Sequence, residues 1–127
     1  MIKRFKFSLF LSLVILYLSL KSADELNKVQ FLNIDHFDKI VHFSMYFALM
    51  SVILFESRKT ALKINSILLL ALYPFLYGIL LEILQATVTT TRYGSIYDAI
   101  FNTLGIILSI AFWYVIRSLT KGRSDSY

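Results

Sequence analysis

The sequence predicts an all-α integral membrane protein, a four-helix bundle whose N and C termini both lie in the cytoplasm. Hydrophobic residues occupy 57% of its 127 positions, and the mean hydropathy of +0.68 is too high for a soluble domain of this size. These residues gather in four stretches of nearly membrane-crossing length. We therefore expect a single transmembrane domain that covers residues 1–127.

The expected spans differ in how well their length suits a membrane. A crossing helix needs about 20 mainly apolar residues, and fewer where flanking lysines or arginines reach the interface. The first stretch follows Lys3 and Arg4 and could also be a cleaved secretory signal peptide, but Lys21 spoils the cleavage site and favours a retained helix. The expected spans are approximately residues 5–20, 40–55, 64–84 and 99–116.

Lysines and arginines predict the orientation of these spans. Three lie before the first span, three between the second and third, and three after the fourth, whereas the other side holds only Lys21, Lys28, Lys39 and Arg92. The positive-inside rule then places both termini in the cytoplasm, whether or not the first segment is removed. Because the net charge of +5 is divided among membrane connections, nucleic-acid binding is not expected. The absence of cysteine excludes disulfides and thiolate metal sites.

Polar side chains occupy the outer ends of three spans at helical spacing. Asp38, His42 and Tyr46 are each four residues apart, and Glu82 and Gln85 are three apart, so each set shares one helix face. Ionisable residues inside a membrane are costly and mark a functional site by default. Because lipid cannot solvate them, we expect them to meet in a pocket open to the outer face. The expected ligand-binding residues are Asp38, Lys39, His42, Tyr46, Glu82, Gln85, Arg92, Ser95, Asp98 and Asn102.

Several of these residues also have simpler interpretations. His42 could be a neutral histidine bonded to a neighbouring helix, and Arg92 and Asp98 could form a structural ion pair. Glu82 lies about one turn inside the third span. Because a carboxylate at this depth in the membrane needs a partner, its presence favours a functional role. A metal site made by His42, Glu82 and Asp98 is chemically possible. The cluster has one histidine and no two-ligand spacing motif, so we expect no metal and no cofactor.

Three motifs follow one another along the chain: Asp38-Lys39-x-x-His42-x-x-x-Tyr46, then Glu82-x-x-Gln85, then Arg92-x-x-Ser95-x-x-Asp98-x-x-x-Asn102-x-x-Gly105. This series resembles the VanZ-like family over about residues 38–109. Ser109 stands where that family often has a second glycine, and serine is still small enough for close helix packing. The resemblance implies a small multi-pass protein of the bacterial cell envelope, associated with reduced susceptibility to glycopeptide antibiotics such as teicoplanin. It implies no established reaction.

We favour a binding function at the outer face of the bacterial cytoplasmic (inner) membrane. Lys39 and Arg92 would contact the phosphate of a membrane lipid or a lipid-linked cell-wall precursor. An alternative is an intramembrane enzyme for a lipid-linked substrate, with Glu82 or Asp98 as base and His42 as acid. Another is a small transporter or regulatory subunit, which would need to oligomerise because four spans offer few walls for a conduction path.

Overall fold

The computed structural model describes residues 2–21, 37–59, 63–88 and 96–124, and it is helical with no strand in these ranges. A short 3₁₀ turn, η1 (Ile2–Arg4), precedes the α-helices. The helices are α1 (Lys6–Leu20), α3 (Phe37–Glu56), α4 (Ile64–Val88) and α5 (Ile96–Ser124). The predicted all-α membrane bundle is confirmed, while the orientation of the termini in the membrane stays a prediction.

Three of the four helices, α3, α4 and α5, are long and apolar enough to cross a membrane. The first helix lies where the sequence placed it, but it has only 15 residues. At 1.5 Å per residue it is about 22 Å long, which is less than the roughly 30 Å of a hydrocarbon core. By length, the described ranges therefore contain three helices that can span a membrane and one shorter apolar helix.

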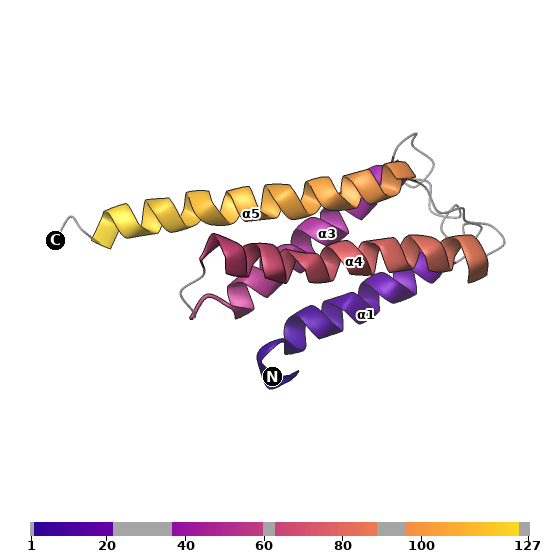
Figure 1. The fold of residues 1–127 in the computed structure, drawn as a ribbon, viewed down its shortest axis with the longest axis horizontal. Helices are drawn as coiled ribbons and strands as arrows, with labels where there is room; N and C mark the ends of the chain where they lie inside the picture. Colours follow the sequence, from indigo (N-terminus) through magenta and orange to yellow (C-terminus); the bar gives the residue numbers. More distant parts are fainter. Residues whose placement is uncertain (1, 22–36, 60–62, 89–95, 125–127) are drawn as a thin grey trace.

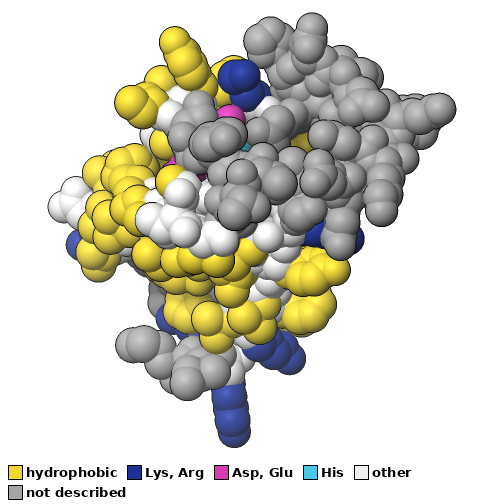
Figure 2. Space-filling model, turned by 90° about the vertical axis from the view of Figure 1, so that its right-hand side faces the viewer, with side chains coloured by type: hydrophobic (Ala, Val, Ile, Leu, Met, Phe, Trp, Pro, Cys, Tyr) yellow, Lys and Arg dark blue, Asp and Glu magenta, His cyan; other side chains and the backbone are white. Residues whose placement is uncertain are grey.

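The helices alternate in direction, so that one end of the bundle collects the end of α1, the start of α3, the end of α4 and the start of α5 (Figure 1). Apolar side chains such as Leu49, Met50 and Leu54 fill the centre of the bundle and are fully buried. Many other apolar side chains point outward, as expected for a surface in contact with lipid (Figure 2).

Helix α3 packs mainly against α5, and small residues on α5 bring the two helices together. A Cβ atom added to Gly105 would overlap the carbonyl oxygen of Phe43, so only glycine fits this crossing. One turn further along α5, Ser109 is buried and its hydroxyl lies 2.8 Å from that of Ser51 on α3. The expectation that Ser109 permits close packing is therefore confirmed, in the manner of small-residue interfaces between membrane helices.

Helix α1 is held against α3 and α4 by polar bonds along its length. The carboxylate of Glu56, the last residue of α3, accepts hydrogen bonds from the backbone amides of Phe7 (2.8 Å) and Ser8 (3.3 Å). These amides have no partner inside their own helix, so Glu56 caps the start of α1. In the middle, Tyr77 of α4 donates to the carbonyl of Ser12 at 2.6 Å, and the Ser12 hydroxyl bonds to that of Tyr73 at 2.8 Å. Helix α1 is thus an integrated part of the bundle.

Candidate functional site

A buried polar cluster, formed by His42, Glu82 and Asp98, lies at the end of the bundle where α3 and α5 begin and α4 ends. Figure 2 views the molecule from this side, and acidic and histidine atoms are visible near a basic side chain. The side chains come from three different helices and are 3%, 8% and 5% exposed, respectively. The predicted convergence of these three residues therefore exists in the structure.

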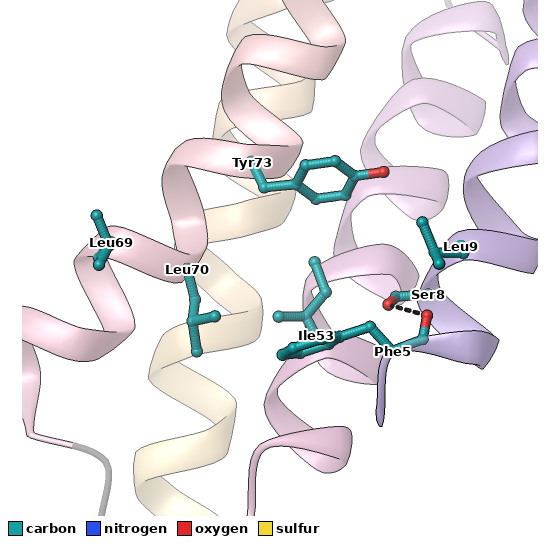
Figure 3. A pocket seen from close by; sticks show the side chains of 7 residues that line it. All are labelled: Phe5, Ser8, Leu9, Ile53, Leu69, Leu70 and Tyr73. Carbon is teal, nitrogen blue, oxygen red and sulfur yellow. Dashed lines mark hydrogen bonds between the residues drawn. The ribbon is translucent and has the colours of Figure 1, made fainter. Parts of the chain in front are cut away.

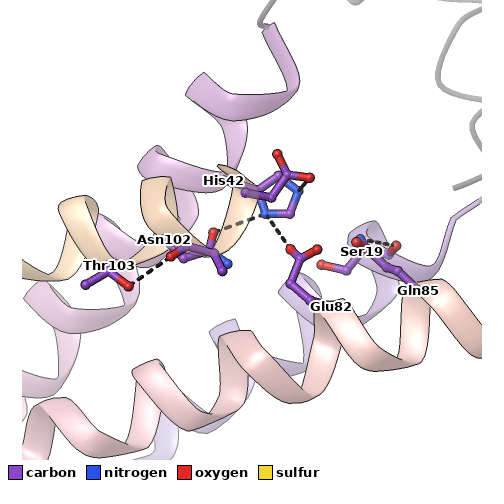
Figure 4. Close-up of polar contacts among 8 residues, drawn as sticks. Ser19, His42, Glu82, Gln85, Asn102 and Thr103 are labelled. Carbon is purple, nitrogen blue, oxygen red and sulfur yellow. Dashed lines mark hydrogen bonds and ion pairs between the residues drawn. The ribbon is translucent and has the colours of Figure 1, made fainter. Parts of the chain in front are cut away.

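The imidazole of His42 lies between the two carboxylates. Its Nδ1 atom is 3.1 Å from Asn102 Oδ1 and 3.6 Å from Glu82 Oε1, while its Nε2 atom is 4.0 Å from Asp98 Oδ2 (Figure 4). An amide oxygen can only accept a hydrogen bond, so Nδ1 is the donor to Asn102. In the neutral ring this leaves the lone pair on Nε2, on the side of Asp98.

Tyr46 and Asn102 continue the site one helical turn deeper, four residues after His42 and Asp98. Both side chains are buried, and Tyr46 Oη and Asn102 Nδ2 make no hydrogen bond within the described ranges. Gly78 of α4 faces both of them, because a Cβ atom there would lie 3.1 Å from the Tyr46 ring and 3.2 Å from Asn102 Nδ2. Buried polar groups without partners are unusual in proteins and point to a missing hydrogen-bonding ligand or water.

Sequence analysis did not single out Gly78. The available signal was its position four residues before Glu82, which places it on the same face of α4. A side chain at this position would press on the two groups that extend the cluster. Gly78 therefore leaves room for Tyr46 and Asn102 beside the His42 ring.

Other predicted site residues are placed differently or lie outside the described residues. Gln85 is buried, but its amide nitrogen donates at 2.8 Å to the carbonyl of Ser19 in the last turn of α1 (Figure 4). Lys39 is partly buried in the first turn of α3, three residues before His42. For Asp38 only the helical backbone is described. Arg92 and Ser95 fall outside the described ranges, and so does the alternative in which Arg92 pairs with Asp98.

A separate cavity of about 320 Å³ lies towards the opposite end of the bundle (Figure 3). Phe5 and Leu9 near the start of α1, Ile53 near the end of α3, and Leu70 and Tyr73 of α4 contribute to its largely apolar lining. This cavity does not include the buried polar cluster and is not the predicted outward-facing pocket. That pocket, and its opening to the outer face, stay a prediction.

Comparison with known proteins identifies a family. A family model described as VanZ/LLP1 matches residues 2–117, which extends the sequence resemblance to include α1. Neither the curated proteins nor the solved structures contain a match to the chain. The matched range covers the buried polar cluster and all the helix contacts described above.

Proposed function

This chain belongs to the VanZ/LLP1 family, and on that premise we propose that its buried polar cluster binds the headgroup of a membrane lipid or a lipid-linked cell-wall precursor. It acts in the bacterial cytoplasmic membrane and lowers susceptibility to glycopeptide antibiotics such as teicoplanin. The uneven distribution of lysines and arginines supports a position of the cluster at the outer leaflet, where cell-wall precursors are used.

The observation that carries the proposal is the meeting of three buried ionisable side chains from three helices. Burying charged groups costs several kcal/mol per ion, and a buried ion pair is weak evidence for a stabilising role because apolar residues of similar volume often serve as well. His42, Glu82 and Asp98 are each more than nine-tenths buried within an apolar membrane bundle. Such a cluster is better explained by an interaction with a polar ligand than by stability.

The surroundings of the cluster suit a phosphate-containing headgroup. Lys39 lies in the first turn of α3 and supplies a positive charge near the end of the bundle, and Arg92 belongs to the connection at the same end. Cationic side chains form strong charge-assisted hydrogen bonds with phosphate. Tyr46 Oη and Asn102 Nδ2 are additional hydrogen-bonding groups without a partner in the described chain, available to orient bound sugar or phosphate oxygens.

The test is a double variant, Lys39→Ala with Arg92→Ala, compared with a matched control, Lys59→Ala with Lys63→Ala, at the opposite end. Each chain is purified in mild detergent, and its bound lipids are identified and quantified by mass spectrometry. Teicoplanin susceptibility is measured in cells with equal amounts of inserted protein. We expect loss of the bound lipid and of the antibiotic effect only in the first variant. Unchanged lipid and unchanged susceptibility would contradict the proposal.

A second candidate is acid–base chemistry on the same class of lipid. It is favoured by the position of the His42 ring between Glu82 and Asp98, an arrangement that can hold and pass a proton. Glu82→Gln keeps the shape of the side chain and removes its basicity. Lost function with retained lipid binding supports chemistry, whereas parallel loss of both supports binding alone.

A further inference from the structure

We infer that His42, Glu82 and Asp98 form a binding site for one divalent transition-metal ion, Zn²⁺ or Mn²⁺. Each residue offers a ligand atom, and the three atoms lie within 4.8 Å of one another. The inference concerns the same cluster as the proposed function but does not depend on headgroup binding. It rests on the chemistry of the ligand set, the hydrogen bond that orients His42, and the unsatisfied groups beside it.

The ligand atoms are close enough to share an ion once the cluster contracts around it. Zinc binds histidine nitrogen and carboxylate oxygen at about 2.0–2.2 Å in tetrahedral geometry, so two ligand atoms on one ion are about 3.3–3.6 Å apart. His42 Nε2 and Asp98 Oδ2 are 4.0 Å apart, slightly beyond this separation. The outer limit of 4.8 Å requires an approach of roughly 1.2–1.5 Å, which rotations of the His42, Glu82 and Asp98 side chains must supply together.

The hydrogen bond from His42 to Asn102 is an independent observation that supports a metal ligand. A metal-binding histidine typically donates its other ring N–H to an oxygen, which selects the tautomer and holds the ring in place. Here Nδ1 donates to Asn102 Oδ1 at 3.1 Å, so the Nε2 lone pair is directed to the side of Asp98. A neutral ring with its lone pair on this nitrogen is the form of histidine that binds a metal ion.

The composition of the site indicates which ion it would take. One histidine and two carboxylates match the mixed nitrogen and oxygen sets preferred by zinc and manganese, whereas magnesium and calcium prefer oxygen ligands throughout. Three protein ligands leave at least one coordination position for water or substrate, as in open zinc sites. Tyr46 Oη and Asn102 Nδ2, one helical turn deeper, are buried and have no hydrogen-bond partner in the described ranges.

From the sequence alone we expected no metal, because no two residues of the cluster follow each other at the short spacing of a metal-binding motif. The structure removes the objection about spacing, since each ligand comes from a different helix, while the cluster still has a single histidine. A bound dipositive ion would be the largest local charge beside Glu82 and Asp98.

The experiment uses the full chain in detergent micelles, stripped with a chelator and then equilibrated with Zn²⁺ or Mn²⁺ alone. Metal content is measured by mass spectrometry after desalting, and affinity by calorimetric titration. We expect about one ion per chain and a rise in thermal stability with metal concentration. Asp98→Asn and Glu82→Gln should abolish stoichiometric binding. Asn102→Ala should weaken it by roughly 10–100-fold, because Asn102 is a positioning residue for the His42 ring.

Glu56→Gln, which changes a carboxylate at the opposite end, is the matched control and should bind like the original chain. Each variant is also equilibrated with Co²⁺, whose absorption spectrum reports whether nitrogen and oxygen ligands surround the ion. Circular dichroism verifies that the variants are folded. Absence of stoichiometric metal, or equal binding by the folded Asp98→Asn and Glu82→Gln variants, would overturn the inference. Lipid is quantified in the same samples with and without chelator, so failure of the metal site and failure of headgroup binding are distinguishable.

Discussion

Replacing Gly105 by alanine tests the close crossing of α3 and α5. The new Cβ atom would overlap the carbonyl oxygen of Phe43 and lie 3.0 Å from the backbone nitrogen of Phe47. Ordinary contacts between such atoms are about 3.5–4.0 Å. Both neighbours belong to the α3 backbone, so no side-chain rotation relieves the overlap and the two helices must move apart.

The magnitude follows from opposing effects. Forcing an extra methyl into a packed contact costs about 1–3 kcal/mol, while alanine gains about 1 kcal/mol over glycine through helix propensity. Moving the helices apart also weakens the Ser51–Ser109 hydrogen bond, and bonds between membrane helices contribute roughly 0.6 kcal/mol. We expect Gly105→Ala to lower the free energy of unfolding by roughly 1–2 kcal/mol.

Gly122→Ala is the matched control, because nothing beyond the adjacent residues and backbone of its own helix lies within 4 Å of the Cβ position there. Each purified chain is unfolded in mixed micelles by increasing the mole fraction of sodium dodecyl sulfate. Unfolding is followed by circular dichroism and by fluorescence of Trp113, the single tryptophan, which lies on α5. We expect a lower midpoint for Gly105→Ala and an equal or higher midpoint for Gly122→Ala. Equal shifts for both variants would refute the steric explanation.

The contacts of α1 and the buried polar cluster lead to three further predictions. Glu56→Gln removes the charge that caps α1, and hydrogen exchange should accelerate in its first turn, with a loss of about 1 kcal/mol. Gln85→Leu removes the donor to the last turn of α1, and exchange should accelerate at that end by an equivalent of roughly 0.5–1.5 kcal/mol. Asp98→Leu alone should lower the free energy of unfolding by about 3 kcal/mol in the detergent titration. Replacing His42, Glu82 and Asp98 together by leucine should change the free energy of unfolding by less than about 1 kcal/mol. This triple variant should also lose ligand binding.

Internal controls accompany these measurements. Backbone exchange in the middle of α5 should be unchanged in the two α1 variants, and uniform acceleration along the whole chain would show general loosening instead of local loss. If exchange in α1 does not respond to Glu56→Gln, the capping role is wrong. If the triple leucine variant unfolds, the cluster is required for the fold and its proposed functional role loses its main support.

Helix positions could be predicted because the apolar stretches are long and end at polar connections. The convergence of His42, Glu82 and Asp98 could also be predicted, since antiparallel spans bring the ends of successive helices together and lipid cannot solvate charged groups. The position of α1 was also predicted correctly, but a count of apolar residues cannot tell whether a 15-residue helix crosses the membrane or packs as a shorter element.

The sequence pattern could not predict which neighbouring helix each polar side chain contacts. Helical spacing shows which residues share a face, but not which neighbouring helix that face meets. Glu82 and Gln85 share a face of α4, yet Glu82 approaches His42 of α3 whereas Gln85 bonds to Ser19 of α1. In the same way, the small residue Gly105 predicted close packing, but only the structure identifies Phe43 as the backbone it touches.

The cap supplied by Glu56 has a consequence for biosynthesis. Helix α1 leaves the ribosome before α3 and α4, which carry the side chains that bond to it. These contacts can all be present only after translation has passed Gln85. The first helix to be synthesised is thus expected to complete its packing only after α3 and α4 have been made.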